Sequence, residues 1–247
     1  MKNKTIILFL LILFFGDVAS AQKSQTTLGI QLRPMVPSKF FGTGPAYQNS
    51  DSISATLYNH LGWNAGVVLR QGLNKMWSIE TGISMVQRNY KMDFESQRFH
   101  IQQSLSYQMI GYEIPLQALI YVQLGEQWYM NGSGGVSFDF YPSNLQKFGS
   151  GVSDTAFIDM SIKTYRQNWM MPSILANLGF EYRTPHKGYY YVGASYHRPL
   201  SQIAVSDLRI ESRGSGNDQL FALNGTYLTL DLRYFLPEST STKKKKT

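Results

Sequence analysis

Alternating apolar and polar side chains in residues 111–124 (GYEIPLQALIYVQL) constrain the fold more than any other feature of the sequence. In an extended chain, one face carries Tyr112, Ile114, Leu116, Ala118, Ile120 and Val122. The other face is mixed and more polar, and it includes Glu113, Gln117 and Gln123. A period of two is that of a β-strand, and roughly 9–11 residues cross a bilayer when the strand is tilted. The segment is therefore typical of a transmembrane β-barrel strand.

Seven other segments share this alternation. We expect strands at residues 26–36, 62–72, 76–87, 128–141, 168–183, 189–200 and 222–236. Together with residues 111–124, they predict an all-β fold, an eight-stranded antiparallel up-and-down transmembrane β-barrel. The barrel must close, because each unpaired backbone N–H or C=O in hydrocarbon costs several kcal/mol.

The connections between these strands alternate between short and long. Three are short turns, at residues 73–75, 125–127 and 184–188. Four are long loops, at residues 37–61, 88–106, 142–167 and 201–221. Bacterial outer-membrane barrels have short periplasmic turns and long extracellular loops, so this order predicts which end faces the exterior. Within the fourth strand, Pro115 has no N–H for the ladder, which predicts a bulge.

The ends of the chain carry separate signals. Residues 1–21 begin with Lys2 and Lys4, continue with a short apolar run and end in Ala-Ser-Ala, which is typical of a secretory signal peptide. We therefore expect a signal peptide at residues 1–21, an outer-membrane barrel at residues 22–236 and a disordered, Lys-rich periplasmic tail at residues 237–247. The mature protein is expected in the outer membrane of a Gram-negative bacterium.

Composition excludes several classes of protein. The formal charge of +7 includes the four lysines at residues 243–246 and two lysines in the signal peptide. The remaining chain is nearly balanced, so nucleic acid is not an expected partner. The absence of cysteine excludes disulfides and a lipid-anchoring cysteine. Beyond the N-terminus, no apolar run approaches the ~20 residues of a spanning helix.

The four tryptophans lie at strand beginnings. Trp77 and Trp128 follow short turns, whereas Trp63 and Trp169 follow long loops. This placement predicts two indoles at each membrane interface, where amphipathic rings are favoured. A soluble barrel of the lipocalin type is the alternative, but it would place apolar side chains inside and polar side chains outside.

Charged residues at inward positions predict a filled lumen. The set is Arg33, Arg70, Arg183 and Arg233 with Glu80, Glu113, Asp139, Glu181 and Asp231. An eight-stranded barrel has room for side chains but not for a wide channel, and buried charges persist only when they are paired. We therefore predict an ion-pair network that plugs the barrel. A narrow ion channel along the same residues is the alternative.

No catalytic, cofactor-binding or metal site is predicted. Four histidines fall in separate segments: His60, His100, His186 and His197. No pair of them has metal-ligand spacing, and no Gly-rich phosphate loop, HExxH or EF-hand pattern is present. A further alternative is a lipid-modifying hydrolase at the outer rim, with His197 acting on Ser195 or Ser201.

The sequence also resembles a known family. Tyr112-Glu113-Ile114-Pro115-Leu116 is similar to the Leu-Glu-Ile-Pro-Leu strand of the small outer-membrane β-barrels of the Bacteroidota, which are called PorT-like. The Gly-rich strand that begins at Trp128 and the closing Leu232-Arg233-Tyr234-Phe235 support the resemblance. It implies an envelope barrel in a family whose named member serves type IX secretion and gliding. The chain departs from that family in its Lys-rich tail.

Two loop positions resemble a modification site of the same phylum. Ser52 and Thr155 each follow an aspartate and precede an apolar residue, which is similar to the O-glycosylation triplet of the Bacteroidota.

These observations favour a non-enzymatic, monomeric barrel that is structural or binds a partner through its extracellular loops. The expected partners are outer-membrane lipid, the barrel-assembly machinery and an extracellular or envelope protein. No cofactor is expected. The rim hydrolase and the narrow channel stay open as alternatives.

Overall fold

The computed structural model describes residues 26–37, 44–50, 53–96, 101–152, 157–212 and 215–237. The regular elements in these residues are all β-strands, which form one sheet of nine strands and one of four. In the same residues, no helix has the length and apolar character needed to cross a membrane. The expected signal peptide, the tail beyond residue 237, and His100, Ser52 and Thr155 lie outside the described residues.

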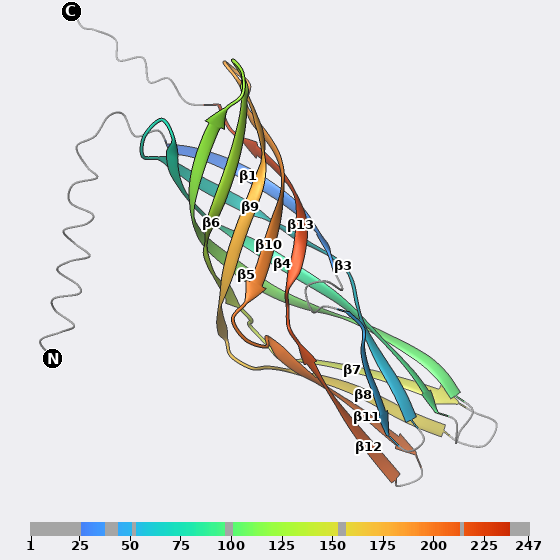
Figure 1. Cartoon of the computed structure of the whole chain (residues 1–247). Helices are drawn as coiled ribbons and strands as arrows, with labels where there is room; N and C mark the ends of the chain where they lie inside the picture. Colours follow the sequence, from blue (N-terminus) through green and yellow to red (C-terminus); the bar gives the residue numbers. More distant parts are fainter. Residues whose placement is uncertain are drawn as a thin grey trace, which may run out of the picture.

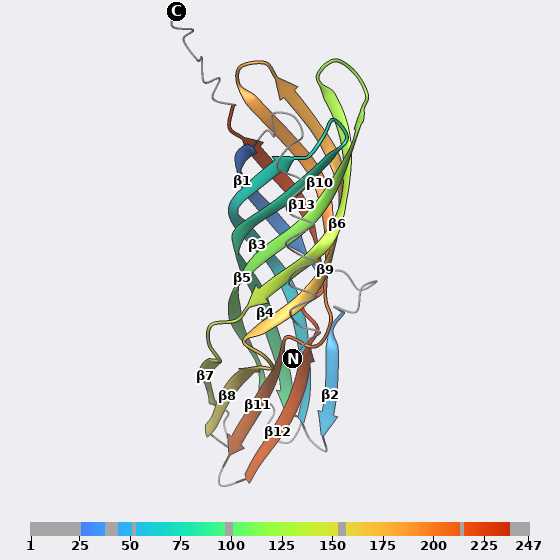
Figure 2. The same cartoon turned by 90° about the vertical axis from the view of Figure 1, so that its left-hand side faces the viewer.

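Eight strands form a closed ring (Figures 1 and 2). In order around the ring they are β1 (Thr26–Val36), β13 (Tyr227–Phe235), β10 (Gly188–Pro199), β9 (Met170–Thr184), β6 (Trp128–Phe140), β5 (Ile101–Gln123), β4 (Trp77–Ser96) and β3 (Ile53–Gly72). All neighbours are antiparallel, and β3 pairs with β1 to close the ring. Gly29 of β1 thus lies opposite both Phe235 of β13 and Val68 of β3. The predicted all-β antiparallel ring of eight strands is confirmed.

The two faces of the ring strands have opposite chemistry. On β5, Leu116 is 52% exposed on the outer wall, whereas Glu113 and Gln117 are buried inside. Other exposed outer-wall side chains are Leu28, Ile30, Leu32, Ile83, Ile114, Val136, Phe138, Leu178, Phe180, Val192, Leu230 and Leu232. An exposed apolar surface of this extent is rare on soluble proteins. The lipocalin-type alternative, with an apolar interior, is therefore wrong.

One end of the ring closes with tight turns. They join β3 to β4, β5 to β6 and β9 to β10, at residues 73–76, 124–127 and 185–187. In the first turn, the Asn74 side-chain oxygen accepts hydrogen bonds from the backbone N–H groups of Met76 and Trp77, at 2.8 Å each. Local bonds of this kind fix the reversal and with it the register of the strand pair.

The other end of the ring continues into further β-structure. The additional strands are β2 (Ala46–Ser50), β7 (Leu145–Val152), β8 (Phe157–Arg166), β11 (Ala204–Ser212) and β12 (Ser215–Leu223). β2 pairs with β3, and the other four form a second sheet in the order β12-β11-β8-β7. Figures 1 and 2 show this sheet facing the long extensions of β3, β4 and β5. The prediction of loops at residues 37–61, 88–106, 142–167 and 201–221 is therefore wrong for most of these positions.

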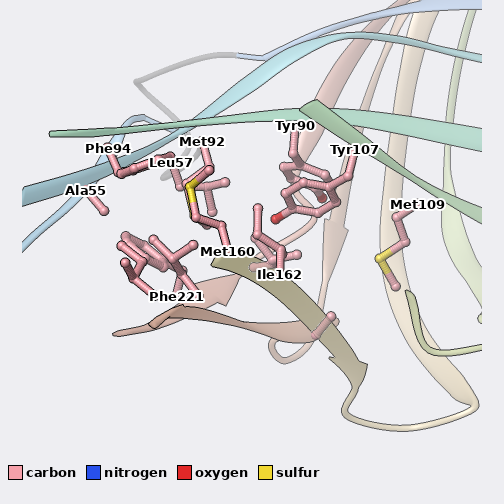
Figure 3. Packing of buried hydrophobic residues seen from close by; sticks show 14 of the residues in the cluster. Ala55, Leu57, Tyr90, Met92, Phe94, Tyr107, Met109, Met160, Ile162 and Phe221 are labelled. Atoms are coloured by element: carbon pink, nitrogen blue, oxygen red, sulfur yellow. The ribbon is translucent and has the colours of Figure 1, made fainter. Parts of the chain in front are cut away.

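A hydrophobic core between the two layers explains the extra strands (Figure 3). Met92 and Phe94 of β4 meet Met160 and Ile162 of β8 and Phe221 of β12, and all five are nearly fully buried. On β4 and β8 the apolar side chains alternate with polar ones, and on β12 Phe221 and Leu223 lie on one face, so each strand has an apolar surface to bury. Each such side chain contributes about 1.5–3 kcal/mol when buried. We call strands β2, β7, β8, β11 and β12, with residues 53–60, 89–96 and 101–110 of β3, β4 and β5, the hairpin domain.

Pro115 does not cause the predicted bulge. The register of β5 against β4 is the same on both sides of Pro115, and the register shift lies instead in β3, between His60 and Trp63. The Thr81 hydroxyl donates to the Pro115 carbonyl at 2.8 Å. This side-chain bond joins β4 to β5 beside the proline, whose missing N–H weakens the ladder.

The last predicted strand, residues 222–236, is divided in the structure. β12 ends at Leu223 and β13 begins at Tyr227. Between them, Gly225 has a φ of 68°, and a Cβ at that position would lie 2.7 Å from the Ile203 side chain. A glycine is therefore needed where the chain passes from the hairpin domain back into the ring.

Candidate functional site in the barrel interior

The charged residues predicted to face the lumen all lie inside the ring. Eight are buried and one, Arg183, is partly exposed. Each occupies an inward position of its strand, so the pleat itself directs its side chain toward the barrel axis. They form two groups of ion pairs, one near the tight turns and one near the hairpin domain. The buried eight are Arg33, Arg70, Glu80, Glu113, Asp139, Glu181, Asp231 and Arg233.

Arg70 is the centre of the group near the turns. Its Nη1 lies 2.5 Å from Glu181 Oε2, and its Nη2 lies 3.0 Å from Glu80 Oε2. Glu80 also pairs with Arg233, whose Nη2 lies 2.7 Å from Asp231 Oδ2. Each of these buried charges thus has an opposite charge at hydrogen-bond distance, which offsets the loss of its hydration.

Arg183 marks the mouth of the ring at the turn end. Its Nε lies 2.6 Å from Glu181 Oε1, and its side chain is 32% exposed. The guanidinium also lies over the Tyr129 ring, 4.1 Å from the centroid. A cavity of about 80 Å³ opens here, lined by Arg70, Tyr121 and Arg183 among others. Two arginines of the ion-pair group, Arg70 and Arg183, are thus part of the lining of this cavity.

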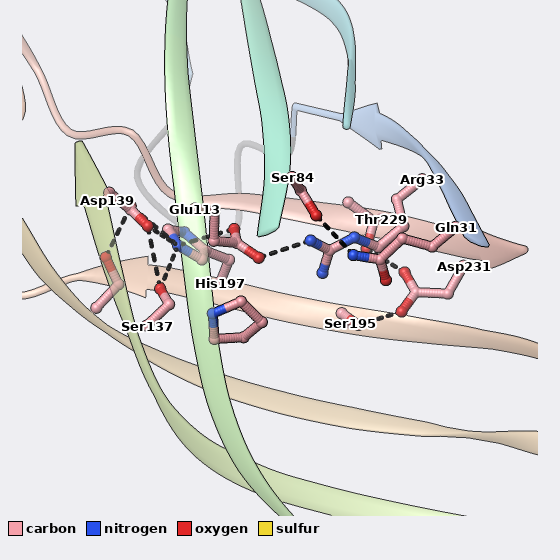
Figure 4. A network of polar contacts seen from close by, with 12 residues as sticks. Gln31, Arg33, Ser84, Glu113, Ser137, Asp139, Ser195, His197, Thr229 and Asp231 are labelled. Atoms are coloured by element: carbon pink, nitrogen blue, oxygen red, sulfur yellow. Dashed lines mark hydrogen bonds and ion pairs between the residues drawn. The ribbon is translucent and has the colours of Figure 1, made fainter. Parts of the chain in front are cut away.

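Glu113 is the centre of the second group, near the hairpin domain (Figure 4). Its Oε1 accepts a hydrogen bond from Arg33 Nη2, and its Oε2 accepts one from the Tyr227 hydroxyl, both at 2.6 Å. Asp139 lies directly opposite Glu113 across the β5–β6 ladder. The imidazole of His197 approaches both carboxylates and stacks on the Tyr227 ring at a centroid distance of 4.4 Å. Side chains of five ring strands therefore meet at this level.

Arg88 and His197 complete this group, although the sequence pattern assigned neither to the ion-pair network. Arg88 falls within a predicted loop, yet it lies in β4, is 5% exposed, and has its Nη2 3.9 Å from Asp139 Oδ2. It continues the inward positions of Glu80 and Ser84 at a period of two, and that signal predicts its direction. Counting Arg88, the described network contains five arginines and five carboxylates.

The geometry at His197 differs from that of a hydrolase triad. Ser195 and Ser201 donate their hydrogen bonds elsewhere, and the hydroxyl beside His197 is that of Ser137, 3.2 Å from Nε2. Asp139 approaches the same nitrogen, whereas a triad has its acid on the other nitrogen. His197 Nδ1 has no hydrogen-bond partner. The arrangement thus lacks the orienting contact that a serine hydrolase uses.

The four tryptophans lie at the two ends of the ring wall. Trp77 and Trp128 directly follow tight turns, and the Trp128 ring packs against Tyr182 at a centroid distance of 4.9 Å. Trp63 lies at the register shift of β3, where that strand leaves the ring. Trp169 directly precedes β9 and is 63% exposed. The exposed apolar wall therefore lies between two levels of indole rings.

Comparisons with known proteins agree with this architecture. Residues 24–204 match the model of a family described as an outer membrane protein beta-barrel domain. No curated protein matches the chain. The fold is similar to the crystal structure of the outer membrane protein OprG from Pseudomonas aeruginosa, with a TM-score of 0.51, 11% identity, and coverage of 87% of this chain and 98% of that one.

A weaker likeness is to the translocator domain of the autotransporter NalP from Neisseria meningitidis, with a TM-score of 0.19, 9% identity and 94% of both chains covered.

The family match spans most of the chain, and it includes seven of the eight ring strands and the charged lumen positions they supply. On that match, and with an apolar outer wall around a polar interior, this chain belongs to the family of outer membrane protein beta-barrel domains.

Proposed function

We propose that this protein is a non-enzymatic, monomeric barrel that binds a partner outside the cell through its hairpin domain. In the orientation that we propose for the barrel in the outer membrane, the tight turns face the periplasm and the hairpin domain faces the exterior, as in bacterial barrels with short periplasmic turns. Trp77 and Trp128 then lie at the inner interface of the membrane, and Trp63 and Trp169 at the outer interface.

The hydrophobic core of the hairpin domain carries this proposal. Because the core joins two facing layers, the surface of the domain is held in one shape and does not have to be ordered on binding. Large apolar side chains stand out on that surface, including Phe148 at 68% exposure and Leu220 at 59%. A pre-formed surface with exposed aromatic anchors is typical of protein recognition.

The filled interior of the ring supports an anchoring role. Over the whole lumen the arginines and carboxylates are equal in number, so the interior lacks the surplus of one sign that a charge-selective pore needs. We therefore propose that the ion-pair network plugs the ring, in preference to the narrow channel. The rim hydrolase is not supported either, because the Ser137–His197–Asp139 contacts all converge on one nitrogen.

The sequence resemblance supports a place in the envelope of a Bacteroidota cell. Residues 112–116 resemble the strand motif of the PorT-like barrels, and we propose that the partner belongs to a secretion, gliding or other envelope assembly. The proposed remaining contacts are outer-membrane lipid along the apolar wall and the assembly machinery during insertion.

Photo-crosslinking in intact cells tests this function. A photoreactive phenylalanine replaces Phe148 or Leu220 on the hairpin domain, and the matched control replaces Leu116 on the lipid-facing wall. The account predicts one discrete protein adduct from both surface positions and none from position 116. The adduct formed at one of these two positions should weaken when the residue at the other position is changed to alanine. Adducts of equal pattern at all three positions, or no protein adduct at the surface positions, would overturn the proposal.

A further inference from the structure

His197 Nε2 is surrounded by oxygen atoms that one N–H cannot satisfy (Figure 4). Asp139 Oδ2 lies at 3.1 Å, Asp139 Oδ1 at 3.3 Å, Glu113 Oε2 at 3.5 Å and Ser137 Oγ at 3.2 Å. A single imidazolium N–H that bonds a carboxylate is drawn to about 2.7–2.9 Å of one oxygen. Here no oxygen is that close, and four lie at nearly equal distance.

The distances from His197 Nε2 to the nearest oxygens of Asp139 and Glu113, 3.1 and 3.5 Å, are close to those between neighbouring ligand atoms around a small cation. Zinc binds imidazole nitrogen and carboxylate oxygen at about 2.0–2.2 Å in a tetrahedron, which places the ligand atoms about 3.3–3.6 Å from one another. The nitrogen of His197 and one oxygen from each of Glu113 and Asp139 all lie within 4.8 Å of one another, and all three residues are buried. Among the described residues, no other group of three or more such side chains has this geometry.

The surroundings favour a cation between the two carboxylates. Glu113 and Asp139 are direct cross-strand partners, and like charges at such positions repel. Arg33 occupies only the far oxygen, Oε1, of Glu113. Arg88 is 3.9 Å from Asp139, which is beyond hydrogen-bond distance. The oxygens that face His197 are therefore not neutralised by a contacting guanidinium.

Neighbouring hydroxyl groups hold the carboxylates in place. Ser137 and Ser173 donate to the two oxygens of Asp139, at 3.1 and 2.9 Å, and Tyr227 donates to Glu113. Hydrogen bonds of this kind orient metal ligands in known sites. Arg88 Nε and Nη2 are buried beside the group without hydrogen-bond partners, and they would meet an anion or water that completes the coordination. Arg88 also lines a cavity of about 30 Å³ on the hairpin-domain side.

We propose that Glu113, Asp139 and His197 form a binding site for a divalent cation of the zinc class, with water or a small anion as the fourth ligand. An imidazole nitrogen among the ligands favours zinc or a neighbouring transition metal over calcium and magnesium, which take six or more oxygen ligands. The ion would join β5, β6 and β10 at the level where the ring passes into the hairpin domain. Its role there is to stabilise the junction.

Metal analysis of the purified barrel tests the site. The protein is prepared in detergent with a tag that lacks histidine, loaded with zinc chloride, desalted and analysed by mass spectrometry for metal. Cobalt loading gives a second readout, because tetrahedral Co²⁺ has strong visible absorption. The account predicts one zinc per chain and a tetrahedral cobalt spectrum.

Two variants and one matched control complete the experiment. Glu113→Gln and His197→Asn should lower the affinity for zinc at least about 100-fold, because losing a ligand exceeds the 10- to 100-fold effect of losing a supporting contact. Glu181→Gln removes a buried carboxylate of the other group and should bind zinc like the parent. Heat-modified gel mobility reports whether each variant is folded. A zinc content near zero in the parent, or equal binding in His197→Asn, would overturn the proposal.

Discussion

Arg70 and Glu80 lie opposite each other on β3 and β4 and are joined by an ion pair of 3.0 Å inside the ring. Glu80 also pairs with Arg233 of β13. In the ring, β1 lies between β13 and β3. One carboxylate therefore joins three ring strands across the place where the ring closes. Arg183 makes a comparable pair with Glu181, but it does so at the mouth and is partly exposed.

Removing the Glu80 charge should destabilise the ring strongly. Glu80→Gln leaves Arg70 and Arg233 without their shared carboxylate, and breaking a buried pair typically costs about 3–5 kcal/mol. Urea unfolding of the protein in lipid vesicles, followed by tryptophan fluorescence, measures the free energy of unfolding. The matched variant Arg183→Gln affects a partly exposed pair and should change it by at most about 1 kcal/mol. Equal losses from the two variants would contradict the burial argument.

A charge on the outer wall should also be costly. Leu116 lies near the middle of the apolar band of β5 and is 52% exposed. Leu116→Arg should lower the free energy of unfolding by about 2–4 kcal/mol, as for arginine at the bilayer midplane. Glu126→Arg, in the tight turn between β5 and β6, is the matched control and should have little effect. A Leu116→Arg variant as stable as the control would show that this wall does not face lipid.

We expect the hairpin domain to unfold locally while the ring stays folded. Phe221 is 1% exposed in its core, so Phe221→Ala should cost about 3–5 kcal/mol locally. Protease added outside intact cells should then cut the hairpin domain while the ring keeps its folded gel mobility. Phe148→Ala changes an exposed side chain and should leave protection unchanged. Loss of the folded ring in Phe221→Ala would instead show that the two parts unfold together.

Alkaline pH should loosen the same domain. Burial raises the pKa of Tyr90 to about 12. The Tyr90 ring stacks on that of Tyr107, and burial raises the pKa of Tyr107 as well. The ordinary tyrosine pKa is about 10, so the folded state holds these protons more tightly than the unfolded state. Their stabilising contribution is complete below about pH 10 and is lost as the pH rises toward about 12. Protease protection across this window should therefore fall less steeply in Tyr90→Phe.

The ring and its polar interior could be predicted because both follow from a period of two. Leu116 and Glu113 are opposite in chemistry and in direction, and the same rule places Arg33, Arg70 and Arg233 inside. The hairpin domain escaped prediction because the alternation in its strands is short and interrupted, for example by Gly149 in β7 and by the buried Gln219 in β12. Met92 and Phe94 show the alternation clearly, yet nothing local reveals which other layer covers them.

The grouping of Glu113, Asp139 and His197 could not be read from sequence spacing either. They are 26 and 58 residues apart along the chain, and they meet only because the register of β5, β6 and β10 brings three inward positions to one level. The period of two predicts that the Arg88 side chain points inward. It does not predict that β4 extends as far as Arg88, because the end of a strand depends on its tertiary partners.

Spin labels along β5 test the central claim most directly, and the natural absence of cysteine makes single-site labelling straightforward. Single cysteines at residues 112–122 are labelled in lipid vesicles, and the accessibility of each label to dissolved oxygen is measured. The account predicts high accessibility at Ile114, Leu116 and Ala118 and low accessibility at Glu113, Pro115 and Gln117, because oxygen concentrates in lipid. An accessibility that lacks this period of two, or that peaks at the odd positions, would contradict a ring with lipid outside and a packed polar interior.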